Sequence, residues 1–178
     1  MNGVRLAGKR SLLRPLEPGD LDAVLRGRAR LDRMAAPRAP DPHRARRRIE
    51  RSGRFWRGTL DLGVATRRGR LIGEVQARKH PAQSLPGGVV EIGIVLFEPA
   101  DRGKGYGSEA VALLIDWLFA KERAERVQAG TAAGNAPART ILERLGFIFE
   151  GTLRGFRETE RGREDMAMYG ILRNEWRR

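Results

Sequence analysis

The sequence contains no cysteine and little histidine, aromatic residue or lysine. Without cysteine the chain has no disulfide, no thiolate nucleophile and no thiolate metal site. His43 and His80 lie far apart in polar surroundings, and neither has a second ligand at metal spacing, so we predict surface roles and no metal site. No apolar run is long enough to span a membrane and no signal segment opens the chain, so we expect a cytoplasmic protein.

The charge balance is strongly positive and rests on arginine. The net charge is +13 over 178 residues, and only four of the 35 basic residues are lysine. Nine arginines against two acids fall between Arg33 and Arg57. This segment is compatible with RNA or ribosome association. The alternative, an arginine-biased composition on solvated helix faces, is favoured because aromatic residues for base stacking are scarce.

A glycine-rich loop joins an apolar segment to a helical pattern. Residues 89–97 are mostly apolar, Pro99 follows, and Gly103, Gly105 and Gly107 lead directly into the spacing of a helix. The unpaired N–H groups and the dipole of a helix N-terminus attract anions, and glycine lets a phosphate approach the backbone. The pattern therefore predicts a site for a di- or polyphosphate.

The spacing of the loop residues excludes two common kinds of phosphate-binding loop. No Lys-Ser or Lys-Thr follows the glycines, as a Walker loop requires, and the spacing is not that of a dinucleotide fold. Arg102 followed by Gly-x-Gly-x-Gly after a strand resembles the pyrophosphate loop of the GNAT N-acetyltransferases, which bind acetyl-CoA. An ordinary glycine-rich turn is the alternative.

The second half of the chain strengthens this resemblance. Asn135 can cap a short helix, Pro137 suits its first turn, and Gly146 is placed to end it before Phe147. With residues 150–154 and 162–169 as a closing hairpin, the chain resembles the RimJ/RimL-like branch, which includes ribosomal-protein and spermidine acetyltransferases. The resemblance covers nearly the whole chain and leaves the substrate open.

We expect a single domain over residues 1–178 of the α/β (α+β) class. Strands are predicted at 11–16, 62–66, 71–77, 89–97, 126–129, 147–153 and 165–172, and helices at 21–34, 44–55, after Gly107 and after Asn135. Residues 35–42 and 80–88 are predicted breaks. The resemblance implies a GNAT fold, with a mixed, mostly antiparallel twisted sheet flanked by helices and a splay between the fourth and fifth strands.

The resemblance also assigns the cofactor residues. Val95, Leu96 and Phe97 would offer backbone groups to the pantetheine arm, and Asn135 would contact the arm across the splay. The pyrophosphate would be held by the loop that contains Arg102, Gly103, Lys104, Gly105, Tyr106 and Gly107. Gly93, inside the fourth predicted strand, marks either a bulge that opens the cleft or close packing of a helix against the sheet.

The implied chemistry is attack of an amine on the acetyl-CoA thioester, which requires a base for the amine proton. Glu91, on the strand beside the cleft, is the first candidate, and its alternative is a solvent-facing residue on an alternating strand. Glu158 in the final hairpin is the second candidate, and an ordinary loop residue is favoured for it. Many family members carry a Tyr or a Ser that can act as general acid for the thiolate. The matching positions here hold Leu142 and Ala138, so the usual general acids are missing. Tyr169 is more consistent with a core or hairpin role.

Three functions remain open at this point. The first is an acetyl-CoA-dependent N-acetyltransferase acting on a protein N-terminus or a small amine, with a homodimer suggested by related proteins. The missing Tyr and Ser also permit an acetyl-CoA-binding protein without turnover. The arginine-rich segment permits a basic RNA- or ribosome-associated module. The positive charge argues mildly against a polyamine acceptor.

Overall fold

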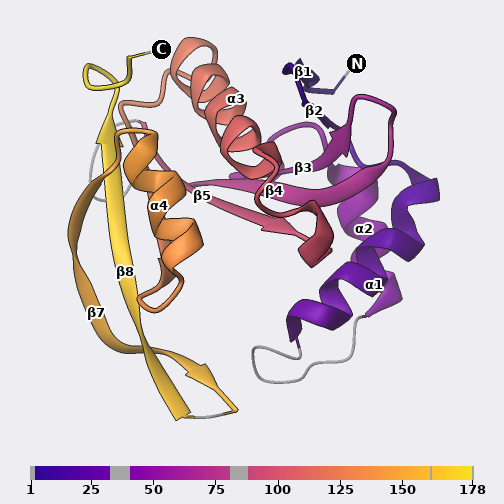
Figure 1. Cartoon of the computed structure of the whole chain (residues 1–178). Helices are drawn as coiled ribbons and strands as arrows, with labels where there is room; N and C mark the ends of the chain where they lie inside the picture. Colours follow the sequence, from indigo (N-terminus) through magenta and orange to yellow (C-terminus); the bar gives the residue numbers. More distant parts are fainter. Residues whose placement is uncertain (1–2, 33–40, 81–87, 161, 178) are drawn as a thin grey trace.

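The computed structural model describes residues 3–32, 41–80, 88–160 and 162–177, which form one twisted sheet with helices on both faces (Figure 1). The sheet has the order β1-β2-β3-β4-β5-β6-β8-β7, and every neighbouring pair is antiparallel except β5–β6. The strands are β1 (Leu6–Ala7), β2 (Ser11–Arg14), β3 (Thr59–Thr66), β4 (Leu71–Lys79), β5 (Val89–Leu96), β6 (Arg126–Ala132), β7 (Ile148–Thr159) and β8 (Gly162–Leu172). The mixed sheet predicted from the resemblance is confirmed.

The helices follow the sequence signals closely. They are α1 (Leu21–Asp32), α2 (Pro42–Arg51), α3 (Tyr106–Ala120) and α4 (Ala136–Arg144), with 3-10 turns η1 (Pro18–Asp20) and η2 (Pro99–Asp101). Asn135 caps α4 through a 3.3 Å bond from the Ala138 N–H, and Gly146 follows the helix in the left-handed region at φ 86°. α2 ends at Arg51, four residues before the predicted end. The predicted extension of α1 to Met34, the break at 35–40 and the loop at 81–87 lie outside the described residues.

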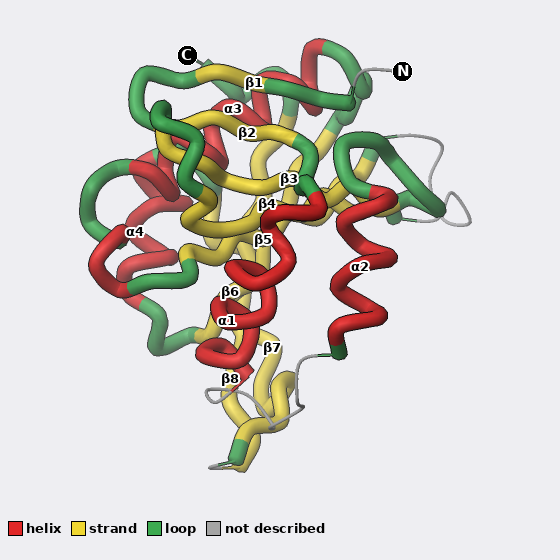
Figure 2. Tube along the Cα trace, turned by 90° about the vertical axis from the view of Figure 1, so that its right-hand side faces the viewer, coloured by secondary structure: helices red, strands yellow, loops and turns green. Residues whose placement is uncertain are grey.

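The hairpin strands are longer than predicted. β3 begins at Thr59 because Trp56 and Thr59 exchange two backbone hydrogen bonds, which start a hairpin upstream of the apolar run. β7 and β8 continue to a tip at Thr159 and Gly162, where the residues are charged and exposed, so their alternation carries no hydrophobic signal. Figure 2 shows this tip projecting away from the rest of the sheet. β1 was not predicted, because two residues are too few to produce a pattern.

The two faces of the sheet have opposite chemistry. On the face covered by α3 and α4, residues such as Leu62, Val75 and Ile92 join Leu114 and Leu118 of α3 in the main apolar core. Burial of each such side chain contributes about 1.5–3 kcal/mol. The opposite face is covered in part by α1 and α2, which close a smaller apolar cluster around Leu16, Val24, Ala45, Ile49 and Phe97. The rest of that face is polar.

The sheet opens between β5 and β6. These strands pair in parallel only from Val89 to Glu91 on one side and from Arg126 to Gln128 on the other. Beyond Glu91, β5 stays in register with β4, and β6, which pairs with β8 along its whole length to Ala132, no longer pairs with β5. The splay predicted between the fourth and fifth strands is therefore present, at β5 and β6. It leaves one backbone edge of residues 92–96 without a strand partner among the described residues.

Candidate functional site

The glycine loop brings the N-terminus of α3 to the surface beside this splay. Asp101 anchors the loop at its start, since its buried carboxylate accepts bonds of 2.6 and 3.0 Å from Arg70. Gly103 (φ 72°) and Gly105 (φ 82°) then take left-handed conformations that suit glycine alone. Gly105 is the N-cap of α3 and supplies no side-chain cap, so the first N–H groups of the helix have no intrahelical acceptor.

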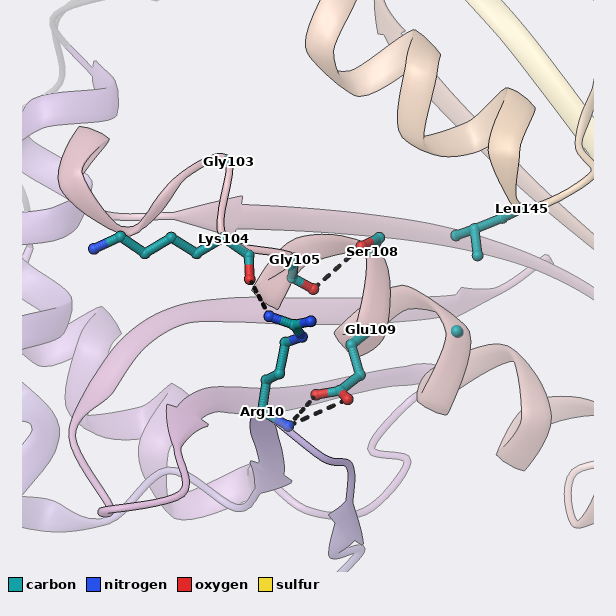
Figure 3. Close-up of a pocket in the computed structure, with 8 residues that line it drawn as sticks. Arg10, Gly103, Lys104, Gly105, Ser108, Glu109 and Leu145 are labelled. Carbon is teal, nitrogen blue, oxygen red and sulfur yellow. Dashed lines mark hydrogen bonds between the residues drawn. The ribbon is translucent and has the colours of Figure 1, made fainter.

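A cavity of about 530 Å³ lies over this helix end (Figure 3). It is lined by Gly103, Lys104 and Gly105 from the loop, by Ser108 and Glu109 of α3, and by Arg10 from the β1–β2 turn. Arg10 adds a cation to the positive end of the helix dipole, whereas the Lys104 side chain extends away from the other lining residues (Figure 3). The arrangement fits an anionic group such as a pyrophosphate, because the N–H donors of the helix end and the Arg10 guanidinium lie beside one concave surface.

Arg10 was not foreseen from the sequence, because a residue 99 positions away holds it in place. The Glu109 carboxylate of α3 accepts bonds from the backbone N–H groups of Lys9, Arg10 and Ser11 and from the Ser11 hydroxyl, at 2.6–3.2 Å. Arg10 then donates to the Lys104 carbonyl at 3.4 Å. Burial favours a higher pKa for Glu109, but these hydrogen bonds outweigh it and lower the pKa.

The predicted loop residues divide into two groups. Gly103, Lys104 and Gly105 line the cavity. Arg102, Tyr106 and Gly107 do not: Arg102 donates to the Leu96 carbonyl at 3.4 Å, Tyr106 packs against the core, and Gly107 is buried beneath α4.

The end of β5 presents its backbone to both sides. Phe97 donates its N–H to the Ile72 carbonyl at 2.9 Å and buries its ring against Gly27 of α1, so its N–H is already paired. Alternate residues of a strand point their backbone N–H and C=O groups to opposite edges. The backbone groups of Leu96 and Ile94 therefore face the splay, while those of Val95 and Phe97 face β4. Of the three residues predicted here, Leu96 is therefore the one whose backbone edge faces the opening.

Asn135 lies at the start of α4, on the far side of the splay. Its side-chain oxygen accepts from the Ala138 N–H as the helix cap. The cap uses the oxygen, and Asn135 as a whole is exposed.

Glu91 stands where the β5–β6 pairing ends. Its side chain is 33% exposed, with His80 Nε2 at 3.4 Å and Arg78 at 3.8 Å. His80 Nε2 also contacts the Gln128 amide at 3.2 Å. His80 was predicted to be a surface residue, and 45% of its side chain is exposed. The pairing of β5 with β4 and with β6 also brings it to Glu91 and Gln128, a contact that the sequence did not predict.

Glu158 lies elsewhere. It is exposed near the hairpin tip and pairs in register with Arg163. β8 contacts β6 only from Met166 onward, so this part of the hairpin extends beyond the paired sheet.

Gly93 neither bulges nor packs closely. The β4–β5 register runs without a shift from Gly73↔Leu96 to Lys79↔Val90, and no atom of the described residues lies within 4 Å of a Cβ built on Gly93. Both readings of this glycine were wrong. It shares a face with Glu91, two residues away, so the strand has open space directly beside the carboxylate.

The residues at the usual acid positions are structural. Leu142 is buried in the main core, and Ala138 supplies the capped N–H of α4. The Tyr169 ring is fully buried, and its hydroxyl accepts from Arg139 and donates to Glu143, both at 2.9 Å. The core role predicted for Tyr169 is confirmed.

A buried ionic cluster adjoins this polar face. Glu74 of β4 is 2% exposed and lies 2.9 Å from both Arg28 of α1 and Arg48 of α2. Arg48 also binds Asp61 of β3 at 2.6 Å. Burial raises the pKa of Glu74 to about 7, against the opposing attraction of Arg48. Composition alone gave no sign of this cluster.

The sequence profile of the family described as acetyltransferase (GNAT) domain matches residues 10–148. The chain belongs to the GNAT acetyltransferase family. An uncharacterized N-acetyltransferase, p20 of Bacillus licheniformis, is 35% identical over 74 residues, 42% of each chain. The alignment thus spans about two fifths of that curated relative.

Solved GNAT structures share the fold across nearly the whole chain. The acetyltransferase (GNAT family) from Bacillus anthracis has a TM-score of 0.79 at 21% identity, covering 97% of this chain and 100% of its own. Mycobacterium smegmatis RimJ in complex with CoA-disulfide has a TM-score of 0.76 at 21% identity, covering 97% and 88%. In the described part of this GNAT chain, no helix is both long and apolar enough to cross a membrane.

Proposed function

We propose that the chain transfers an acetyl group from acetyl-CoA to a primary amine, as a member of the RimJ/RimL-like branch. One observation carries the proposal: the splay between β5 and β6 runs to the uncapped N-terminus of α3. A ligand with an extended arm and a pyrophosphate can occupy both, since the arm fits the open strand edge and the pyrophosphate fits the helix end.

The cofactor side uses mainly backbone. The pyrophosphate would accept from N–H groups of the loop that contains Gly103, Lys104 and Gly105, and the Arg10 side chain would add charge. The pantetheine arm would be held along β5 by the backbone of Leu96, with Asn135 on the other side of the splay. Arg102 contributes indirectly, by fixing the end of β5 through the Leu96 carbonyl.

The acceptor side uses Glu91. The incoming amine must be neutral, so Glu91, with His80 Nε2 at 3.4 Å, accepts one proton from the ammonium form. The neutral nitrogen then bonds to the acetyl carbon, and the carbonyl oxygen carries the transient negative charge. The C–S bond breaks to release the thiolate of CoA, and the nitrogen gives its second proton to that thiolate, which leaves the amide and the CoA thiol. A thiol pKa near 8.5 lets the thiolate leave with little help, which suits a site where Leu142 and Ala138 replace the usual acids.

The acceptor is a protein N-terminus or a small amine. The net charge of +13 disfavours polyamines, which would be repelled before reaching the cleft.

The test is acetyl-CoA-dependent thiol release with a panel of N-terminal peptides and small amines. Glu91→Gln should lower kcat by roughly a hundredfold or more while the Kd for acetyl-CoA stays the same. Glu158→Gln is the matched control and should leave both unchanged. Tight acetyl-CoA binding with no release by any amine would favour the binding-only function, and absence of acetyl-CoA binding would refute the proposal.

A further inference from the structure

A second cavity, of about 410 Å³, lies between α2 and the start of β3. We call it the arginine pocket; its charged lining is Arg44, Arg47, Arg48, Arg51, Arg57 and Asp61. Trp56 and Thr59 complete the wall. Arg44, Arg47, Arg48 and Arg51 share one side of α2 because they follow the three- and four-residue spacing of a helix. The positive charge of the 33–57 segment is thus partly gathered into one concavity.

The charge of this pocket is not balanced from within. Among the described residues that line it, Asp61 is the only acid, and its carboxylate is already held by Arg48 at 2.6 Å and by the Gln76 amide at 2.9 Å. In the described ranges, Arg44, Arg47, Arg51 and Arg57 form no salt bridge. Four guanidinium groups that share one concavity repel one another, and an anion between them would relieve that repulsion.

The backbone that presents Arg57 is itself unusual. Arg57 (φ 48°) and Gly58 (φ 78°) form a two-residue hairpin turn, closed by bonds of 2.8 and 3.0 Å between Trp56 and Thr59. Such turns favour Asn, Asp or Gly at the first position, so an arginine there costs stability. The turn places that guanidinium at the rim of the pocket.

The pocket shares a sheet face with Glu91. Thr59 pairs with Arg78 across β3–β4, and Arg78 pairs with Glu91 across β4–β5, so the three side chains point to the same side. Two strand spacings separate Thr59 from Glu91, which is roughly 10 Å. Arg78 bridges the interval, with 57% of its side chain exposed and one nitrogen 3.8 Å from Glu91.

Recognition of a nucleic-acid strand fits this geometry less well. Trp56 is the one aromatic ring in the lining, and the Arg51 guanidinium lies over it at 5.2 Å. A base would have to displace that cation–π contact to stack. A compact anion needs only the guanidinium groups.

We propose that the arginine pocket is the anion subsite for the acceptor, so that the amine acetylated beside Glu91 carries a carboxylate or phosphate roughly 10 Å from its nitrogen. This inference rests on the proposed acetyltransferase function. An extended peptide covers about 3.3 Å per residue, so the anion would fall on the third or fourth residue of an N-terminal substrate.

The test uses three peptides with free N-termini that differ only at positions three and four: Asp-Asp, Asn-Asn, and phosphoserine followed by Asn. Binding to the CoA-loaded protein is measured by calorimetry, and kcat/KM by thiol release. We expect the wild type to prefer an acidic or phosphorylated peptide over the neutral one by about tenfold or more. Whichever anionic peptide, Asp-Asp or phosphoserine-Asn, binds more tightly identifies the preferred anion as a carboxylate or a phosphate.

The variants are chosen to spare the fold. Arg44→Gln with Arg47→Gln removes two exposed pocket charges, and Arg57→Asn removes one while suiting the turn. Each should erase most of the preference through KM, with kcat and activity on the neutral peptide unchanged. Arg46→Gln, on the other side of α2 and exposed, is the matched control and should keep it.

Equal affinity for all three peptides, or an equal loss in Arg46→Gln, would overturn the subsite while leaving the acetyltransferase intact. Loss of single-stranded RNA retention in the pocket variants, with peptide preference unchanged, would overturn it in favour of an RNA site. Failure to bind acetyl-CoA at all would instead refute the proposed function, and the calorimetric arm separates that result from the others.

Discussion

The cofactor end of the cleft and its acceptor face are built by different means. At the cofactor end, two left-handed glycines and an uncapped helix N-terminus form the surface, and these are consecutive in the chain. The acceptor face combines side chains from β4, β5 and β6, of which Glu91, His80 and Gln128 are examples. A backbone site is encoded locally, whereas a side-chain site depends on which strands become neighbours.

The largest expected effect is a loss of acetyl-CoA affinity when Gly105, at the cofactor end of the cleft, is substituted. Gly105→Val forces a β-branched residue into φ 82° with its Cβ 3.4 Å from Arg10, so the loop must change shape. Acetyl-CoA affinity, measured by calorimetry, should fall by about a hundredfold or more, near 2.7 kcal/mol. Gly69→Val, at φ 89° in a turn with open space around it, carries the same backbone strain and should lower stability alone. Unchanged affinity in Gly105→Val would show that the loop does not hold the cofactor.

The second expected effect is a dependence of stability on pH, which arises from Glu74, buried on the same face of the sheet as the acceptor site. Its raised pKa means that the folded state binds a proton more tightly than the unfolded state, so this group favours folding most at low pH. Relative to Glu74→Gln, the wild type should lose on the order of 1–3 kcal/mol of unfolding free energy as pH rises from about 4.5 to about 7. Urea titrations of both proteins across this range measure the difference. A gap that widens in favour of the wild type with rising pH would contradict the raised pKa.

The smallest effect concerns the space beside Gly93. A leucine there meets no atom within 4 Å of its Cβ and suits a strand better than glycine, so stability should hold or rise. The side chain would fill the space next to Glu91, and kcat/KM for the amine should fall by about tenfold, near 1.4 kcal/mol, with acetyl-CoA affinity unchanged. The kcat/KM of Gly93→Ala should lie between those of the wild type and Gly93→Leu. Full activity in the leucine variant would show that the acceptor amine does not bind on this face.

The contrast explains what the sequence could predict. The strand at 89–96, the glycine loop and the cap at Asn135 were all foreseen, because each is set by neighbours within a few residues. Arg10 was missed because Glu109 positions it across almost a hundred residues. His80 looked solitary in the sequence, and only the register of β4 against β5 and of β5 against β6 brings it beside Glu91 and Gln128.

Gly93 shows a different limit. A glycine inside a strand suggested either a bulge or tight packing, since both remove the need for a Cβ. The regular register and the open space around it fit neither. What its missing side chain provides is empty volume, and an absence of atoms leaves no pattern in a sequence.

The three residue pairs that join β5 to β6 also have a mechanical consequence. The sheet is two smaller sheets, β1–β5 and β6–β8–β7, that share a short seam near Glu91. Each half is held together by its own long ladders, whereas among the described residues only these three pairs join the two halves. A ligand lodged in the opening would lie between the two halves as a wedge, and the angle between them would then set the distance from acetyl donor to acceptor.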